Sequence, residues 1–140
     1  MTVVSNGNIY GKIYNWYTVN DPNGLCPVAW HIPSDAEFQQ LVNFLGGSAT
    51  AGGKLKSTNL WASPNTGANN LSGFTNLPAG NRSSSNGIFT NSLGMAGTFW
   101  ALTEVDSDFA WAHYCRSDSE LSYREFFGKL GGFSVRCLKN

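Results

Sequence analysis

The sequence predicts a loop-rich α+β domain with one main helix and an antiparallel sheet. Three observations support this fold class. Gly, Asn and Ser are abundant while only 13% of the 140 residues are charged, a composition that favours turns and loops over long helices. Five Trp and nine Phe can supply an aromatic core. One strong helix signal precedes several strand-like runs near the C-terminus.

The N-terminal part is expected to form a strand that ends in a turn. The run from Ile9 to Val19 is rich in aromatic and β-branched side chains, which are favoured in strands. The segment Asn20-Asp21-Pro22-Asn23-Gly24 follows it directly and has strong turn chemistry.

The clearest single element is a helix that begins after Ser34. Ser34 and Glu37, three residues apart, form a capping box, and apolar residues recur at helical spacing from Phe38 to Leu45. Gly46-Gly47 predicts where this helix stops. A second, shorter helix is expected through Gly53-Lys54-Leu55-Lys56.

The second half of the chain is expected to be a long ordered loop followed by strands. From Asn59 to Gly97 the chain is mostly Asn, Ser, Gly and Pro. Single apolar residues should pin this loop to the core, namely Trp61, Phe74, Leu77 and Phe89. The later strand-like runs are spaced like an antiparallel meander. They cover Thr98 to Glu104, Phe109 to Cys115, Leu121 to Phe127, and Phe133 to Lys139.

The charge balance argues against two classes of partner. Nine basic and nine acidic residues give a formal net charge of zero, and without a run of either sign there is no electrostatic footprint for nucleic acid or an anionic membrane. No apolar stretch approaches the length of a membrane span, and the beginning of the sequence lacks the regions of a signal peptide. We therefore expect neither nucleic-acid binding nor direct membrane insertion.

Three cysteines cannot all pair within one chain. A bond between Cys26 and Cys137 would tie the front of the domain to its back, and closing a loop of about 100 residues would stabilise it by roughly 4 to 5 kcal/mol in the chain-entropy treatment. Such a bond implies an oxidising compartment. Two buried, reduced thiols are the alternative, because free Cys is often fully buried. Cys115 is then the odd thiol, and no basic cluster beside it indicates an activated thiolate.

Five motifs follow one another in a characteristic order along nearly the whole chain. They are Tyr10-Gly11-Lys12-Ile13-Tyr14-Asn15-Trp16-Tyr17, Gly24-Leu25-Cys26-Pro27, Trp30-His31-Ile32-Pro33-Ser34-Asp35-Ala36-Glu37, Gly52-Gly53-Lys54-Leu55-Lys56 and Gly132-Phe133-Ser134-Val135-Arg136-Cys137. Together they resemble the Fibrobacter succinogenes major paralogous domain family. The resemblance implies a C-type lectin fold of the formylglycine-generating-enzyme branch, formed by residues 1–140 as one domain. It also implies adjacent N- and C-terminal strands and a bond between Cys26 and Cys137.

Within that fold, residues 101–131 resemble the variable region of proteins diversified by diversity-generating retroelements. In such systems, template Asn codons are rewritten to a set of residues that excludes Lys, Glu, Gln, Met and Trp. Residues 105–109 and 112–118 all belong to the permitted set, and Asn does not occur between Asn91 and Asn140. Depletion of Asn in strands is the alternative explanation. The excluded residue types would be framework, namely Glu104, Trp111, Glu120, Glu125 and Lys129.

We therefore expect a recognition surface on the C-terminal strands and their loops. Rigid aromatic side chains supply contact area at low entropic cost, and charged ones add directional contacts. The expected ligand is a protein or glycan on a cell surface, with the domain itself extracellular, on a cell surface or on a phage particle, and no cofactor is expected. The expected ligand-binding residues are Val105, Asp106, Ser107, Asp108, Phe109, Ala112, His113, Tyr114, Arg116, Ser117, Asp118, Tyr123, Phe126, Phe127 and Leu130.

Some aromatic residues near this surface are expected in the core. Trp100, Trp111 and Phe133 are assigned to the core. Phe109 and Phe127 stay open between core and surface, because strand alternation puts Phe109 on the same face as Trp111.

Two other function classes are weighed against recognition. A structural or assembly module of a surface lipoprotein or pilus, without a dedicated ligand, is the first alternative. An enzyme is less favoured, because neither His31 nor His113 has a recognisable spacing with a nucleophile or a metal-ligand set. The formylglycine-generating relatives work through a cysteine pair with metal, whereas the motif positions of Cys26 and Cys137 indicate a structural role.

A calcium site is the remaining chemical alternative. Glu104, Asp106 and Asp108 alternate along the chain, and hard cations bind several carboxylate oxygens. However, the sugar-coordinating tripeptides of true C-type lectins are absent from the sequence, and exposed acidic residues at a loop tip are usually solvated. No metal site is therefore expected.

Overall fold

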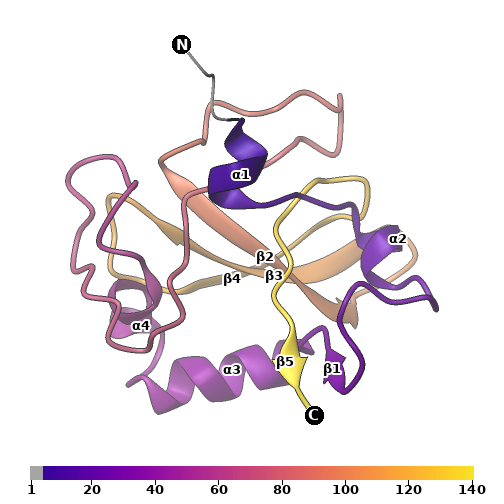
Figure 1. The fold of residues 1–140 in the computed structure, drawn as a ribbon, viewed down its shortest axis with the longest axis horizontal. Coiled ribbons are helices and arrows are strands. Elements are labelled where there is room, and N and C mark those ends of the chain that lie inside the picture. The colour runs from indigo at the N-terminus through magenta and orange to yellow at the C-terminus, as the bar shows by residue number, and fades with distance from the viewer. Residues whose placement is uncertain (1–4) are drawn as a thin grey trace.

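The computed structural model describes residues 5–140 and shows small antiparallel sheets joined by short helices and long loops (Figure 1). This confirms the predicted α+β class. The helices are α1 (Asn6–Tyr10), α2 (Trp16–Val19), α3 (Asp35–Phe44) and α4 (Ser48–Leu55). The strands are β1 (Trp30–His31), β2 (Ala96–Glu104), β3 (Phe109–Arg116), β4 (Tyr123–Gly128) and β5 (Leu138–Lys139). No helix within residues 5–140 is long and apolar enough to cross a bilayer.

The central sheet contains β2, β3 and β4 in that order, all antiparallel. It confirms the first three strands of the predicted meander. The fourth run, Phe133 to Lys139, does not continue the meander. Instead Phe133 bridges to Tyr14, Ser134 forms a parallel bridge to Phe99, and β5 pairs with β1. The chain returns along the outer edge of β2, so this segment joins the two ends of the domain.

The strand predicted for Ile9 to Val19 is wrong, because this segment consists of the end of α1, a non-helical stretch over residues 11–15, and α2. The Asn15 side chain accepts a hydrogen bond from the Thr18 backbone nitrogen at 3.0 Å, which caps α2. Trp16 and Val19, one helical turn apart, are both buried. A short helix therefore places two apolar residues of this segment on one buried face, which a strand with alternating faces would separate.

The two helices that follow have a local origin in the sequence. Ser34 and Glu37 form both bonds of the predicted capping box at the start of α3, and α3 ends at Phe44, just before the two glycines. The second helix is longer than predicted. It packs so closely that a Cβ on Gly52 would lie 2.0 Å from the carbonyl oxygen of Leu121, which explains a glycine within a helix.

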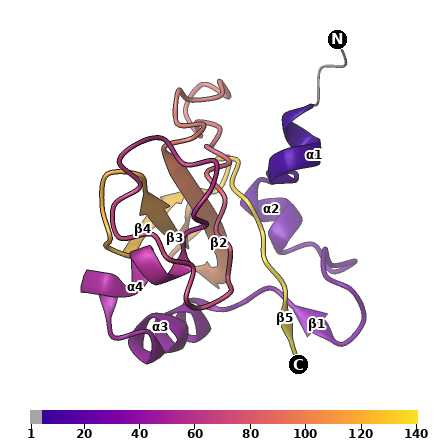
Figure 2. The same cartoon turned by 60° about the vertical axis from the view of Figure 1, so that its left-hand side comes forward.

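The helices cover the two faces of the central sheet differently. Helices α3 and α4 lie against one face, while α2 and the C-terminal segment lie on the other (Figure 2). On the α2 side, Trp100 and Phe133 are buried in one core cluster, as predicted. On the α3 side, Phe38 and Phe99 belong to a second cluster. The sheet is thus held from both sides, which favours a rigid platform.

The cysteines behave as the resemblance implies. Cys26 and Cys137 form a disulfide across a sequence separation of 111 residues. The free thiol, Cys115, is buried against the α4 side of the sheet. Burial raises the pKa of Cys115 to about 11, so the thiol is protonated near neutral pH.

The long loop is anchored at one end and exposed at the other. Trp61 is buried, and its indole nitrogen donates to the carbonyl of Asn76 at 2.9 Å. Phe74 and Leu77 are half-buried, which agrees with the predicted anchoring. Phe89 is 70% exposed, so its predicted anchoring role is wrong, because residues around it fold into a projecting turn.

A buried lysine fastens this loop to the sheet. Lys56 is fully buried, and its ammonium donates to the carbonyls of Thr66, Arg116 and Ser119 at 2.8, 2.9 and 2.8 Å. The same ammonium lies over the ring of Trp61. Three carbonyls from two loops therefore converge on one positive charge, which holds the end of β3 in place.

Candidate ligand-binding surface

The register of β3 and β4 divides the predicted site residues between the two faces of the sheet. Tyr114 pairs with Tyr123, and Trp111 pairs with Phe126. Since side chains alternate along a strand, Phe109, Trp111 and Phe126 share the face that carries α3. Tyr114, Tyr123 and Phe127 share the opposite face. The sequence thus predicted one surface where the structure has two.

Three of the predicted ligand-binding residues are buried. Ala112 is fully buried in the core cluster of Trp100, His113 is only 6% exposed, and Ser117 is 7% exposed. His113 stacks on Phe38 with ring centroids 4.6 Å apart. These three positions are corrected from surface to interior, because the core cluster of Trp100 and helix α3 cover Ala112 and His113 on the central strand β3. Ser117 follows β3, and its backbone bonds to Met95 and Thr66 hold it against the long loop.

The other predicted residues reach the surface wholly or partly. Nine are exposed, namely Val105, Asp106, Ser107, Asp108, Phe109, Arg116, Asp118, Phe126 and Leu130. Three are half-buried, namely Tyr114, Tyr123 and Phe127. The exposed residues before β3 belong to the β2–β3 hairpin, and most of the others lie on or next to β3 and β4.

An aromatic patch forms at the hairpin end of the α3 face. We define it as Val105, Phe109, Trp111 and Phe126. Phe126 makes edge-to-face contacts with Phe109 and Trp111, at centroid distances of 5.7 and 5.8 Å. Phe126 is 54% exposed, Val105 43% and Phe109 39%, whereas Trp111 is half-buried. Phe109, which the sequence left undecided between core and surface, therefore lies at the surface.

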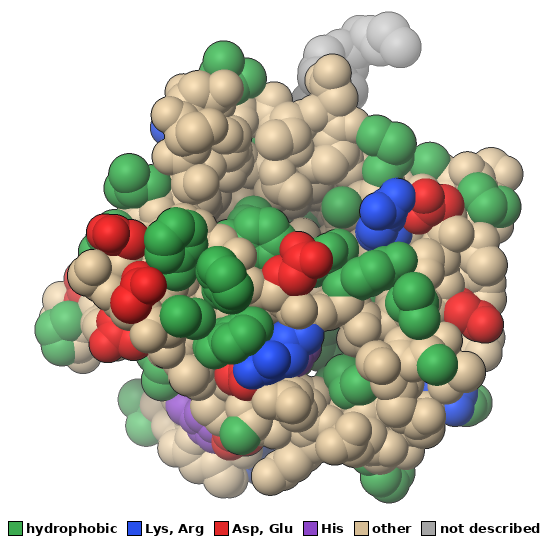
Figure 3. Space-filling model, turned by 180° about the vertical axis from the view of Figure 1, so that it is seen from behind, with side chains coloured by type: hydrophobic (Ala, Val, Ile, Leu, Met, Phe, Trp, Pro, Cys, Tyr) green, Lys and Arg blue, Asp and Glu red, His purple; other side chains and the backbone are tan. Residues whose placement is uncertain are grey.

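The patch is visible on the face turned away from Figure 1. In Figure 3, hydrophobic side chains gather in the left half of this face beside several acidic side chains, with a basic side chain directly below them. Isolated apolar residues on a surface are ordinary, but aromatic residues that contact one another and stay exposed indicate an interaction site.

Arg124 supports the aromatic patch through a contact with the ring of Trp111, and we call Arg124 and its ion pair with Asp35 the brace. Its guanidinium lies 3.5 Å from the ring centroid of Trp111, a cation–π contact. It also donates from Nε and Nη2 to the two carboxylate oxygens of Asp35, both at 2.8 Å. The ring of Trp111 is therefore held between the sheet and an ion pair, which fixes its orientation.

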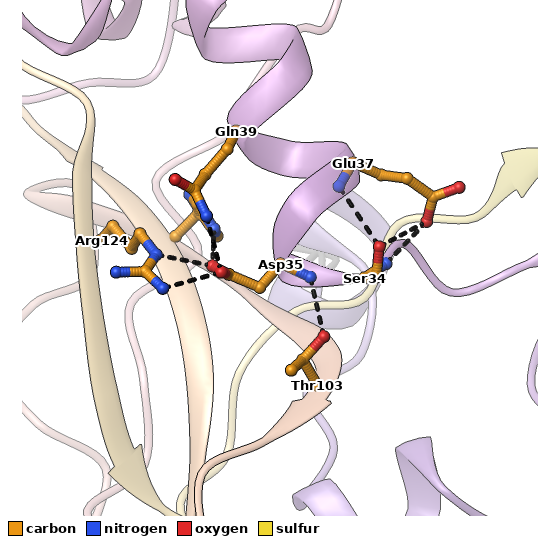
Figure 4. A network of polar contacts seen from close by, with 7 residues as sticks. Ser34, Asp35, Glu37, Gln39, Thr103 and Arg124 are labelled. Atoms are coloured by element: carbon orange, nitrogen blue, oxygen red, sulfur yellow. Dashed lines mark hydrogen bonds and ion pairs between the residues drawn. The ribbon is translucent and has the colours of Figure 1, made fainter.

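Asp35 connects this brace to helix α3. Figure 4 shows its carboxylate between Arg124 and Gln39, with its backbone nitrogen donating to the Thr103 hydroxyl. The His113 ring nitrogen Nε2 lies 2.9 Å from the same carboxylate. Burial opposes ionisation of Asp35, but hydrogen bonds from Arg124 and His113 outweigh it and hold the pKa below its ordinary value. The carboxylate of Asp35 is therefore charged at neutral pH, and both of its oxygens accept hydrogen bonds.

The β2–β3 hairpin is held by a second buried lysine. Lys129, 4% exposed, donates to Glu104 at 2.7 Å and to the carbonyls of Asp106 and Ser107. The Asp106 carboxylate accepts from the backbone nitrogens of Asp108 and Phe109. The carboxylates of Glu104 and Asp106 thus both have hydrogen-bond partners in the protein. Across residues 5–140, no group of three His, Cys, Asp or Glu side chains is placed to hold a metal ion.

The opposite face carries a tyrosine pair. Tyr114 and Tyr123 stack with centroids 4.8 Å apart and an interplanar angle of 9°. The pKa of Tyr114 is raised to about 12, mainly by burial and secondly by the nearby charge of Glu125. Arg116 beside them forms an ion pair with Asp118 at 2.8 Å. This second group offers hydroxyls and a charge pair rather than an apolar surface.

A groove extends from the brace between α3 and β4. It has a volume of about 470 Å³, and Gln39, Asn43, Ser48 and Arg124 are among the residues that line it. Arg124 belongs both to this groove and to the support of Trp111. The aromatic patch and the polar groove therefore lie on either side of one residue.

Sequence reasoning missed Arg124 and Asp35 as parts of this surface. Strand alternation alone places Arg124 on the same face as Phe126, two residues later. That signal was available in the sequence. The role of Asp35 was not, because its partners are distant in the chain and only the packing of α3 on the sheet brings them together.

The histidine next to the capping box is satisfied by hydrogen bonds, as expected. The two ring nitrogens of His31 contact Asn140 and Glu37. Hydrogen bonds to these two side chains raise the pKa of His31 above its ordinary value. Its position near the C-terminus, away from β3 and β4, separates it from the aromatic patch.

Comparison with known proteins assigns the chain to one family. The model of the Fibrobacter succinogenes major domain matches residues 3–139. Neither the curated proteins nor the solved structures gave a match. Because the match spans nearly the whole sequence and agrees with five ordered motifs, the chain belongs to the Fibrobacter succinogenes major domain family.

Proposed function

We propose that this protein is a non-enzymatic ligand-binding domain of C-type lectin fold that displays a variable recognition surface. The observation that carries the proposal is the aromatic patch, in which Phe126 contacts Phe109 and Trp111 while more than half exposed. Aromatic residues dominate binding energy at protein interfaces. The ligand is a protein or glycan on a cell surface.

The rigidity of the patch supports recognition. Arg124, Asp35 and Trp111 form a braced support, and Lys129 holds the adjacent hairpin. A preorganised surface loses less conformational entropy on binding, so more of the contact energy appears as affinity.

The chemistry of the remaining groups supports a non-enzymatic, extracellular role. The free thiol of Cys115 is buried, and its pKa of about 11 disfavours the nucleophilic thiolate. The Cys26–Cys137 disulfide fits an oxidising environment. Both are consistent with a domain of a cell-surface or phage receptor-binding protein.

Diversification by a retroelement is the finer part of the proposal. Residues 105–109 all belong to the permitted set and are all exposed, so substitutions there leave the core intact. A near-copy of the C-terminal coding segment, rich in adenine and close to a reverse transcriptase gene, is the expected genomic neighbourhood. If the gene has neither neighbour, the diversification part of the proposal is wrong, whereas the proposal of ligand binding is unaffected.

The binding experiment begins with panning against bacterial surface extract and a glycan array. Once a ligand is found, Phe126→Ala should weaken binding by at least about 2 kcal/mol, as expected for a central aromatic contact. Phe44→Ala is the matched control, because Phe44 is 87% exposed on α3 but lies outside the patch. Equal affinities for wild type, Phe126→Ala and Phe44→Ala would place the site elsewhere.

A structural or assembly module is the second candidate. A groove of about 830 Å³ between α1 and residues 79–93 lies away from the aromatic patch. Exposed Phe89 lines it. If Phe89→Ala blocks incorporation into a surface assembly while Phe126→Ala does not, this second candidate is favoured.

A further inference from the structure

The central sheet has one covered edge and one open edge. At the outer edge of β2, the Trp100 nitrogen donates to Ser134 at 3.1 Å and the Ser134 nitrogen donates to Thr98 at 3.0 Å. The Gly80 nitrogen donates to Ala96 at 2.9 Å. The backbone groups on this side are thus used by the chain itself.

The outer edge of β4 is different. The Lys129 nitrogen donates to Asp108, and the β3–β4 register then turns the backbone groups of Glu125 toward β3 and those of Arg124 and Phe126 outward. Among residues 5–140, the backbone N–H and C=O groups of Arg124 and Phe126 have no hydrogen-bond partner. Both residues are exposed. Two backbone N–H donors and two backbone C=O acceptors therefore face solvent, with the spacing that an added β-strand would need to pair with them.

We propose that β4 binds an extended peptide segment of a partner protein, which adds to the sheet as a further antiparallel strand. The proposal rests on the function given above and specifies its ligand class as a peptide rather than a glycan. An open edge recognises the backbone of an extended peptide by main-chain hydrogen bonds, and the side chains on either face supply specificity. The closed edge at β2 leaves β4 as the side of the central sheet that can accept one.

The side chains along β4 specify the chemistry of the peptide. On one face, Phe126 presents the aromatic patch beside the open edge. On the other face, the Glu125 carboxylate is exposed and forms no ion pair within residues 5–140. Successive residues of an added strand point to opposite faces. The partner segment should therefore alternate aromatic or aliphatic residues with basic ones, the basic residue lying beside Glu125.

A second copy of the chain complements this edge poorly. An antiparallel β4 from another molecule would bring its own Tyr123, Glu125 and Phe127 to the face that carries Glu125. None of these side chains is basic, and directly opposed carboxylates are destabilising. The charge of Glu125, which has no ion-pair partner among residues 5–140, thus favours a different, basic partner over self-association.

The test uses fluorescence anisotropy with a synthetic ten-residue peptide in which Lys alternates with Val or Phe. Two further peptides carry N-methyl groups, one on the amides of the apolar residues and one on the amides of the lysines. In antiparallel pairing the apolar residues lie opposite Phe126, so their amides face β4. Methylation of the apolar amides should weaken binding at least about tenfold, and methylation of the lysine amides should leave it nearly unchanged.

Protein variants test the same edge independently. Glu125→Lys should weaken binding of the basic peptide about tenfold or more and permit binding of its Glu-containing counterpart, whereas Glu120→Lys, an exposed acidic control, should do neither. Phe126→Pro removes an outward backbone N–H that Phe126→Ala retains, so Pro should weaken binding further than Ala. Circular dichroism confirms that each variant is folded.

The outcomes separate strand addition from the broader function. If no peptide binds, or if both methylated peptides bind like the parent, strand addition is wrong. If a ligand found by panning is lost in Phe126→Ala but the peptide methylated on its apolar amides binds like the parent, ligand binding stands and strand addition fails. If sedimentation shows a dimer that Phe126→Pro abolishes, a second copy occupies the edge and the peptide proposal is overturned.

Discussion

Replacement of Lys56 by Met should destabilise the fold more than the same replacement at Lys54 or Lys12. The Lys56 ammonium is fully buried and donates to three carbonyls within 2.9 Å. Methionine keeps most of the apolar stem but leaves those carbonyls unsatisfied. Each unsatisfied buried acceptor costs about 1 to 3 kcal/mol, and partial relaxation toward water brings the expected loss to about 3 to 5 kcal/mol.

The other two lysines provide graded controls. Lys54 donates to one carbonyl, that of Leu45, so Lys54→Met should cost about 1 kcal/mol. Lys12 is exposed, so Lys12→Met should change stability by less than about 0.5 kcal/mol. Urea denaturation measures all three, with an unchanged m value as the sign that the unfolded state is unaffected. A Lys56→Met loss no larger than that of Lys12→Met would refute the role of the buried charge.

Two further predictions concern the cysteines and the buried histidine. A thiol reagent under denaturing, non-reducing conditions should label Cys115 alone. Labelling of all three cysteines would show that Cys26 and Cys137 are not bonded and would weaken the extracellular assignment. Burial lowers the pKa of His113 below its ordinary 6.5 despite the bond to Asp35, so the unfolded chain binds a proton first as the pH falls. The contribution of His113 to stability should be fully present above pH 6.5 and should decline as the pH falls below that value. His113→Gln should flatten that decline in urea titrations at several pH values, and an equally steep decline would contradict this assignment.

The sequence by itself determined the features that depend on neighbouring residues. The Ser34–Glu37 capping box starts α3 as predicted, because both partners lie within one helical turn. The first three strands of the meander were also predictable, since alternation and turn residues act locally. The disulfide followed from the ordered motifs of the family rather than from spacing.

Tertiary structure decided which face each residue occupies and which segments pair. Trp16 and Val19 lie in a helix because burial beside Trp100 outweighs their strand propensity. His113 is interior because α3 covers its face of β3, and the residue type that placed it in the variable segment cannot show what covers a strand. Arg124 reaches Asp35 across 89 positions. Such contacts depend on the packing of distant elements, which no local pattern in the sequence contains.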